Sequence, residues 1–486
     1  MSREGRGDER NVSSVGGPSD RHGPTTEPEA TSLLTRRSFL ATTGIALGGA
    51  VVLPGALRSS AKKSLASEAI AVRDQSLAGY SKANIDWKQA EGTTLVLAGE
   101  SSTWWETYSP IFHVFEDLTG IKLTVQTSGE TAYVSKLPVQ LASGSPVPDV
   151  YLDWSYPQSV ASHWAEPLSA YLHNPKLTDA SWFNFGDVLP PPKAFVTWTD
   201  GEIYGLPVDA SVETMFYRKN YVSTSLSTFE DVMNAARRAH HAGFAGIAMR
   251  GLGTAAAVAW PLGGFIFTYG GYIIDPAGRP ALDSPQTIAA VAEYADMLKY
   301  YGPPGVTSWS FPQVISALEE DRCAIAISGA FALPYVLNSK LTVDNSEIIM
   351  TRFPSRGGVS RPNLFFWTLA MNTRSKNKIG SWLFMQWVTS YTTATLVTPS
   401  SEPARAAVYD SPKYKDFYGA HNAKVILESL KTADPKPFNL AWRNPNFTEV
   451  GNALGRATSA IISGEATPAA ALRSAQRIAV AGLSQK

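Results

Sequence analysis

The sequence predicts an α/β protein built from two lobes. Its 486 residues are 44% hydrophobic and 11% aromatic, which is enough to bury a large core and excludes a wholly disordered chain. Strand-like and helix-like patterns alternate from residue 93 to residue 152. At roughly 150 residues per domain, the part that follows the N-terminal leader contains two or three domains.

The first elements read as β-α-β-α-β. A short apolar strand at 93–98 comes before a helix that Ser109 and Pro110 open and Gly120 ends. Apolar residues then alternate from Ile121 to Val125 as a second strand. A second helix follows up to Gly144, and a third strand covers 149–152. This order is typical of a parallel, doubly wound sheet.

The second half continues the alternation. Ser227 and Glu230 have the spacing of a capping box, and Ser284 and Pro285 open a further helix. The remaining predicted elements are strands at 324–328 and 364–371 and helices at 378–388 and 453–462. No internal repeat of 20–50 residues is present.

The N-terminal leader predicts the compartment. Arg36 and Arg37 come before a weakly apolar stretch from Phe39 to Leu57, which resembles a twin-arginine export signal. The alternative is a lone transmembrane anchor, although the glycines and threonines in this stretch make a poor membrane span. No cysteine ends the apolar stretch for lipid attachment, and no clear cleavage site follows it. We therefore expect either a cleaved leader or an uncleaved tether.

Composition and missing motifs exclude several classes of protein. Lys+Arg and Asp+Glu number 42 each without a dense basic stripe, so we expect no nucleic-acid partner. The single cysteine, Cys323, lies in an apolar strand pattern and is expected to be a packed thiol. Nucleophile-elbow, phosphate-loop, dinucleotide and zinc-protease motifs are absent, so we expect no cofactor and no metal. His240 and His241 are expected on a helix, at its solvated end, and 319–321 in a solvated turn.

Several segments, in a consistent order, carry a resemblance to a known family. They are 115–123 (FEDLTGIKL), 133–137 (YVSKL), 141–150 (LASGSPVPDV), 200–209 (DGEIYGLPVD), 216–219 (FYRK), 270–275 (GGYIID), 282–285 (LDSP) and 375–377 (SKN). Over residues 93–482 the chain resembles the extracellular solute-binding proteins of carbohydrate ABC importers, the maltodextrin/glycerol-phosphate-binding type. Segments 301–309 (YGPPGVTSW) and 402–405 (EPAR) are similar to the branch that binds polyols and small sugars. Phe331 differs from the Trp of several relatives.

The resemblance implies a periplasmic-binding-protein fold with crossover hinge strands and a ligand cleft between the lobes. The implied division is 1–60 as a disordered segment and export signal, 61–92 as a linker, 93–207 plus 355–403 as the N-terminal lobe, and 208–354 plus 404–486 as the C-terminal lobe. The implied partners are a carbohydrate or polyol ligand, ABC permease subunits and the twin-arginine export machinery. We expect a monomer.

Aromatic and charged residues, several of them where strands end and loops begin, are the candidate ligand contacts. Rings pack on the C–H faces of a sugar, while carboxylates and guanidinium groups bind its hydroxyls. The candidates are Trp104, Trp105, Asp153, Trp154, Asp209, Trp260, Trp309, Trp367 and Arg405.

Several of these candidates have structural alternatives. Trp104 and Trp105 could both be core residues, and Asp153 could cap a helix. Asp209 could make a hinge hydrogen bond, Trp309 could pack onto the second lobe, and Arg405 could form an interlobe salt bridge.

The sequence thus favours an exported, non-enzymatic receptor that captures a sugar, oligosaccharide or polyol for a membrane permease. One alternative is an exported carbohydrate-active hydrolase or lyase, in which Asp153 and Asp209 would face each other across water. Another alternative is a sensory or adhesion module that keeps the binding fold.

Overall fold

The computed structural model describes residues 77–486 apart from 102, 154–155, 338–344, 398–401 and 484–486. These residues belong to one compact unit that spans 67–486. The predicted export signal and residue Trp154 lie outside the described residues. In the part described, no helix combines the length and the apolar character that crossing a bilayer requires.

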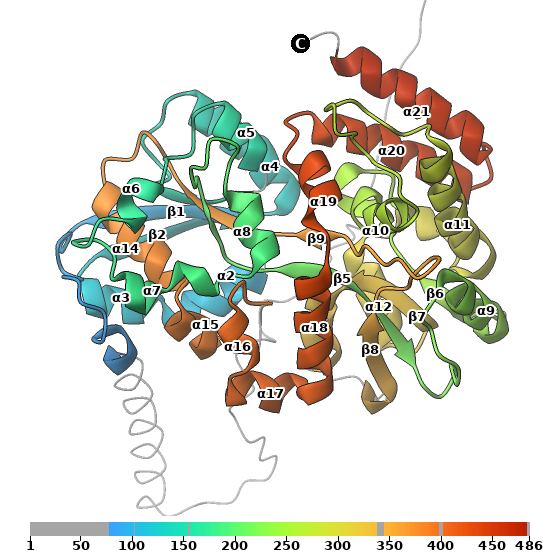
Figure 1. Cartoon of the computed structure of the whole chain (residues 1–486), viewed down its shortest axis with the longest axis horizontal. Coiled ribbons are helices and arrows are strands. Elements are labelled where there is room, and N and C mark those ends of the chain that lie inside the picture. The colour runs from blue at the N-terminus through green and yellow to red at the C-terminus, as the bar shows by residue number, and fades with distance from the viewer. Residues whose placement is uncertain (1–76, 102, 154–155, 338–344, 398–401, 484–486) are drawn as a thin grey trace, which may run out of the picture. The chain divides into compact units, whose positions relative to one another are not determined.

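Two five-stranded β-structures organise this unit (Figure 1). The first sheet has the order β2 (Lys122–Ser128), β1 (Thr94–Glu100), β3 (Val150–Asp153), β10 (Thr368–Met371) and β4 (Leu206–Pro207). The second has the order β6 (Ala245–Ala248), β7 (Cys323–Gly329), β5 (Ser211–Arg218) and β8 (Ile348–Arg352), with β9 (Leu364–Phe365) also paired to β5. Each sheet with its helices is called a lobe below.

Helices cover both lobes. Those that follow the strands of the first sheet are α2 (Thr103–Tyr108), α3 (Phe112–Thr119), α4 (Glu130–Ala142), α5 (Tyr156–Ala161), α6 (Ser169–Leu172), α7 (Ala180–Phe183), α8 (Pro190–Val196), α14 (Lys378–Val388) and α15 (Tyr391–Val397). The others are α9 (Phe229–Ala239), α10 (Trp260–Thr268), α11 (Pro285–Tyr301), α12 (Phe311–Glu319), α13 (Leu333–Leu337), α16 (Ala406–Tyr409), α17 (Pro412–Tyr418), α18 (Ala420–Thr432), α19 (Pro435–Trp442), α20 (Phe447–Ile462) and α21 (Pro468–Leu483).

The predicted β-α-β-α-β start is confirmed. Strand β1 pairs in parallel with both β2 and β3, which places it between them. Gly120 ends α3 with a left-handed φ of 70°, a conformation that glycine adopts without the steric cost of a Cβ. Ser284 caps α11 by accepting a hydrogen bond from the Thr287 N–H, also as predicted.

Three local predictions were wrong. The capping box of α9 is Thr228 with Asp231, one residue later than expected. The apolar stretch at 364–371 is not one strand, because β9 pairs with the second sheet and β10 with the first. Helix α9 stops at Ala239, so His240 and His241 do not lie on it, although they are exposed at its C-terminal end as expected.

The segment before β1 is not a linker where it is described. Tyr80 is fully buried and Trp87 nearly so. Tyr80 packs against Trp182 and Trp387 with ring centroids 6.2 and 6.1 Å apart. Aromatic burial thus ties these residues to the first lobe. The exact lobe boundaries stay a prediction.

Cys323 is a packed thiol, as expected. It lies fully buried at the start of β7, and burial raises the pKa of its thiol to about 12. A thiol with this pKa is protonated at neutral pH and is a poor nucleophile.

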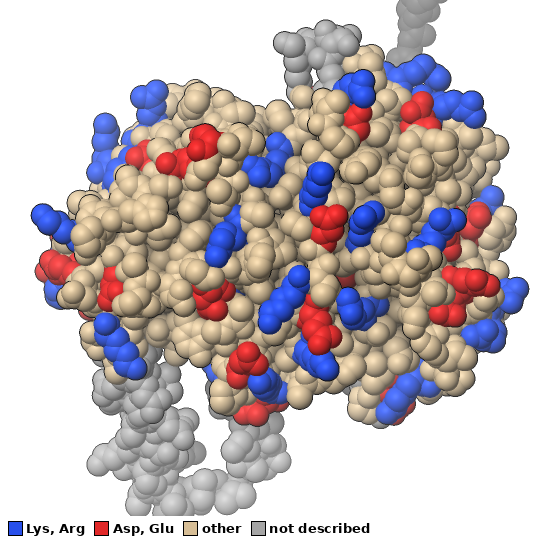
Figure 2. All heavy atoms as spheres, in the orientation of Figure 1, with Lys and Arg blue, Asp and Glu red and all other residues tan. Residues whose placement is uncertain are grey.

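Charged residues of both signs are interspersed on the face shown in Figure 2. They do not gather into a single-sign patch on this face.

Candidate ligand-binding site

Three chain segments cross between the two lobes and meet at one place, which we call the crossover joint: residues 207–211, 364–368 and 402–405. The Val208 N–H donates to the Trp367 carbonyl over 2.9 Å, and the Ala210 N–H donates to the Glu402 carbonyl over 2.8 Å. Segments far apart in the sequence are therefore hydrogen-bonded side by side. In Figure 1, β9 lies between the two sheets at this joint.

The first-lobe side of the joint carries buried acid and tyrosine side chains. Asp153 ends β3, pairs in register with Thr368, and is only 2% exposed. Burial and then the nearby Asp153 raise the pKa of both Tyr133 and Tyr151. These hydroxyls stay protonated at neutral pH and can donate hydrogen bonds.

Asp209 lies on the crossover itself. Its Oδ1 accepts the Trp367 N–H over 2.7 Å, so it does make the hinge hydrogen bond that was weighed as an alternative. The residue is partly exposed, yet removal of its carboxyl from water, with Glu100 adding repulsion, raises its pKa to about 8. Glu402 accepts a hydrogen bond from the Ser211 hydroxyl, and burial raises its pKa as well.

The second-lobe side carries rings and one cation. The Arg250 guanidinium lies 4.9 Å from the ring of Trp260, 5.7 Å from Phe311 and 5.9 Å from Phe331. The rings of Trp260 and Phe331 are 6.1 Å apart. A cation held over aromatic faces in this way is stabilised by the ring quadrupoles.

Sequence reasoning missed Arg250 and Glu213 on this side. Arg250 follows the carboxyl end of strand β6, the position that singled out Asp153 in the first lobe. Glu213 is a lone carboxylate inside the apolar strand β5 and is fully buried. A polar residue within or directly after an apolar strand was the signal that could have found both.

The remaining candidates lie in different settings. Trp104 lies in α2, and Trp105 is buried against Phe112 and the backbone of Gly99. Trp367 is half-buried at the joint, with its ring 5.3 Å from that of Phe365.

Arg405 points away from the polar cluster of the joint. Its guanidinium donates to the carbonyls of Thr389 and Asn184 and lies over the ring of Phe183. No ion pair to Arg405 occurs among the described residues, so the interlobe salt bridge is not seen in that part of the chain.

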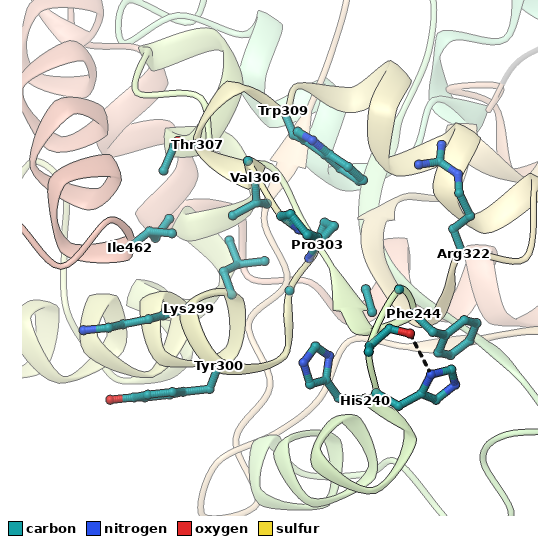
Figure 3. A pocket seen from close by; sticks show the side chains of 18 of the residues that line it. His240, Phe244, Lys299, Tyr300, Pro303, Val306, Thr307, Trp309, Arg322 and Ile462 are labelled. Carbon is teal, nitrogen blue, oxygen red and sulfur yellow. Dashed lines mark hydrogen bonds between the residues drawn. The ribbon is translucent and has the colours of Figure 1, made fainter.

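Trp309 lines a separate hollow of about 600 Å³ in the second lobe (Figure 3). His240, Lys299 and Arg322 also line it, beside the C-terminal ends of α9, α11 and α20. Basic side chains near helix C-termini offset the negative ends of the helix dipoles. The ends of α9 and α11 account for His240 and Lys299, whereas Arg322 forms an ion pair with Glu320 over 2.7 Å. The hollow is separate from the crossover joint.

No cluster of His, Cys, Asp and Glu suitable for a metal ion occurs within the described ranges. Two α/β lobes joined by three crossover segments, with hydrogen-bonding groups on one side and rings on the other, define a two-lobed ligand-binding protein. Residues 103–394 match the family described as bacterial extracellular solute-binding protein, and the chain belongs to this family.

Curated relatives agree with this assignment. The chain is 26% identical over 415 residues to an erythritol/L-threitol-binding protein of Mycolicibacterium smegmatis, covering 78% of this chain and 83% of the relative. It is also 26% identical over 347 residues to a mannitol-binding protein of Pseudomonas aeruginosa, covering 65% and 76%.

Solved structures share the fold. An ABC transporter solute-binding protein of Agrobacterium radiobacter in complex with ribitol superimposes with a TM-score of 0.72 at 20% identity, covering 80% of this chain and 98% of that one. One from Agrobacterium vitis with bound D-mannitol gives a TM-score of 0.70 at 22% identity, covering 81% and 99%. The predicted two-lobed α/β fold is thereby confirmed.

Proposed function

We propose that this protein is the substrate-binding receptor of an ABC importer and that it captures a polyol or small sugar at the crossover joint. The observation that carries the proposal is the pairing of Asp153 and Asp209 on one side with Trp260 and Arg250 on the other. Carboxyl oxygens, protonated or ionised, accept hydrogen bonds from hydroxyls, and a ring covers the C–H face of the same ligand. Two relatives named for binding erythritol, L-threitol or mannitol support this ligand class.

The proposal also covers the export route, the oligomeric state and the permease partner. The protein leaves the cytoplasm by the twin-arginine route, acts as a monomer outside the membrane, and hands its ligand to permease subunits. It performs no chemistry on the ligand. Trp104, Trp105, Trp154 and Trp367 remain proposed contacts that ligand-binding measurements on single variants can test. For Trp309, which lines the separate hollow, and Arg405, which donates to backbone carbonyls, we propose a structural role instead.

The test is a thermal shift of the full chain with erythritol, ribitol, mannitol, maltose, an amino-acid mixture and phosphate. A ligand at 100 times its dissociation constant adds about 2.7 kcal/mol of stability, which raises the melting temperature by a few degrees. We expect a rise with one polyol or sugar class only. A rise with amino acids would contradict the proposal. So would a cooperatively melting protein whose melting temperature none of the compounds raises.

Incubation of the stabilising compound with the protein, followed by chromatography, separates receptor from enzyme. A receptor returns the compound unchanged, whereas a hydrolase or lyase returns products.

A further inference from the structure

Two consecutive residues, Asn363 and Leu364, hydrogen-bond to Trp260, one to its backbone and one to its ring. The Asn363 Nδ2 donates to the Trp260 carbonyl over 2.6 Å, and the Trp260 Nε1 donates to the Leu364 carbonyl over 3.1 Å. Leu364 begins β9, one of the segments of the crossover joint. The position of this ring is thus tied to the joint and not only to its own helix.

A fully buried carboxyl holds Asn363 in turn. The Glu213 Oε2 accepts the Asn363 N–H over 3.1 Å, and the Asn363 carbonyl accepts the Glu213 N–H over 2.9 Å. Burial raises the pKa of Glu213, and the hydrogen bond from the Asn363 N–H and the positive charge of Arg250 partly offset this rise. Arg250 also lies over the Trp260 ring. Hydrogen bonds therefore link Glu213 to Asn363 and Asn363 to Trp260, and Arg250 lies over the ring at the end of this series.

Two glycines of helix α10 leave room for the side chains of Glu213 and Asn363. A Cβ on Gly264 would lie 1.9 Å from the Glu213 Oε2, and a Cβ on Gly263 would lie 2.4 Å from the Asn363 Nδ2. Any side chain at either position would collide with a buried polar group. The Gly263-Gly264 pair of α10 is thereby explained by close approach of these polar side chains.

A π-helix directly before Trp260 adds a second support. It spans Ala255–Ala259, and its Ala255 N–H donates to the Asn452 side chain over 2.8 Å. Single π-helical turns are frequent at functional sites, where they re-aim the following side chains.

We propose that Glu213 and Asn363 are positioning residues: they hold Trp260 against the crossover and thereby set which ligands the site selects. This inference rests on the proposed function, because it requires that Trp260 contacts the ligand. Glu213 and Asn363 fix the position of Trp260 through hydrogen bonds in which the ligand takes no part. They therefore influence ligand selectivity without contacting the ligand.

The first test measures the environment of the Trp260 ring by fluorine NMR in the absence of ligand. The full chain is labelled with 5-fluorotryptophan, and the Trp260 resonance is assigned by its loss in Trp260→Phe. We expect Glu213→Leu to shift or broaden the Trp260 resonance and Glu213→Gln to restore it, because an amide oxygen still accepts the Asn363 N–H. An unchanged Trp260 resonance in folded Glu213→Leu overturns the proposal.

If Glu213→Leu does not fold, Asn363→Leu takes its place. This variant keeps a similar side-chain volume, removes the Nδ2 donor to the Trp260 carbonyl and introduces no ionisable group. The same shift is expected, and an unchanged resonance again overturns the proposal.

The second test measures selectivity as the ratio of the dissociation constants for erythritol and mannitol. We expect Glu213→Leu to change this ratio about tenfold, and to change it little when Trp260 is already Phe, because residues that act through each other are not additive. Equal changes in both backgrounds contradict the proposal. Gln386→Leu is the matched control, since Gln386 is fully buried and donates to the Leu177 carbonyl in the first lobe.

The two tests keep this inference separate from the proposed function. If the unaltered protein binds none of the polyols or sugars, the proposed function fails. The fluorine resonance of Trp260 still decides whether Glu213 and Asn363 position the ring.

Discussion

The two sides of the crossover joint use different chemistry. The first-lobe side presents Asp153 and Asp209 with buried tyrosines nearby, which are groups able to form hydrogen bonds. The second-lobe side presents Trp260 and Arg250, which offer a ring face and a cation.

This difference indicates a division of labour in binding. Hydrogen bonds to hydroxyls are directional and discriminate between stereoisomers, whereas ring contacts depend on buried area and tolerate variation. We therefore expect the first lobe to set stereochemical preference and the second lobe to supply much of the affinity and, through the position of Trp260, the preference for ligand size. The four predictions below test this comparison, from the largest expected effect to the smallest.

Removal of the second-lobe ring should have the largest effect. Trp260→Ala is expected to lower the free energy of unfolding by about 3–5 kcal/mol, as for other buried Trp-to-Ala changes, and to abolish detectable ligand binding. Urea unfolding and calorimetric titration measure the two effects. The control is Trp387→Ala in the first-lobe core, which should lose similar stability and keep its affinity. Normal affinity in folded Trp260→Ala would remove this ring from the site.

Removal of the first-lobe carboxylate should weaken binding less. Asp153→Ala is expected to cost about 1–3 kcal/mol of binding free energy, because ligand hydroxyls lose a buried acceptor. Titration with a stereoisomer pair should show that discrimination falls more than affinity does. Glu166→Ala, which removes a carboxylate paired with Lys378 in the same lobe, is the control and should bind normally. An unaltered stereoisomer ratio would argue against the division of labour.

Arg405 offers a contrast in which stability and binding separate. Arg405→Met should lower the free energy of unfolding by about 1–2 kcal/mol, since the Thr389 and Asn184 carbonyls lose their donor. The dissociation constant should stay unchanged, because the guanidinium points away from the joint. A weakened affinity with intact stability would instead make Arg405 a ligand contact.

The smallest effect concerns pH, because solvent screens a partly exposed carboxyl. The pKa of Asp209 is raised to about 8 in the folded protein, above its value of about 4 in an unfolded chain. The folded state therefore binds this proton more tightly, and stability is lost as the pH rises from about 4 towards 8. Melting temperatures from pH 5 to pH 9 should fall in this direction. Asp209→Asn should reduce the slope, and an identical slope would exclude Asp209 as its source.

Much of the fold could be predicted from local pattern. Helix α14 was predicted with its observed ends, Lys378 and Val388, and the parallel start of the first sheet follows from alternating periods and turn residues. Hydrophobic periodicity and helix capping involve residues that are close in sequence, so both can be recognised from the sequence alone. The 364–371 segment failed because nothing local reveals that its two halves pair with different sheets.

The sequence by itself determined the fold class, the buried thiol and the family resemblance, since each depends on residue type and short-range order. It also proposed Asp153 at a strand end, Asp209 at the crossover and Trp260 before a glycine-rich stretch as candidate contacts. Only the tertiary structure decided which of these come together, and it added Arg250, Glu213 and Asn363 to them. Asn363 lies 103 positions from Trp260 and 150 from Glu213, and hydrogen bonds across such separations follow from chain crossing and not from local propensity.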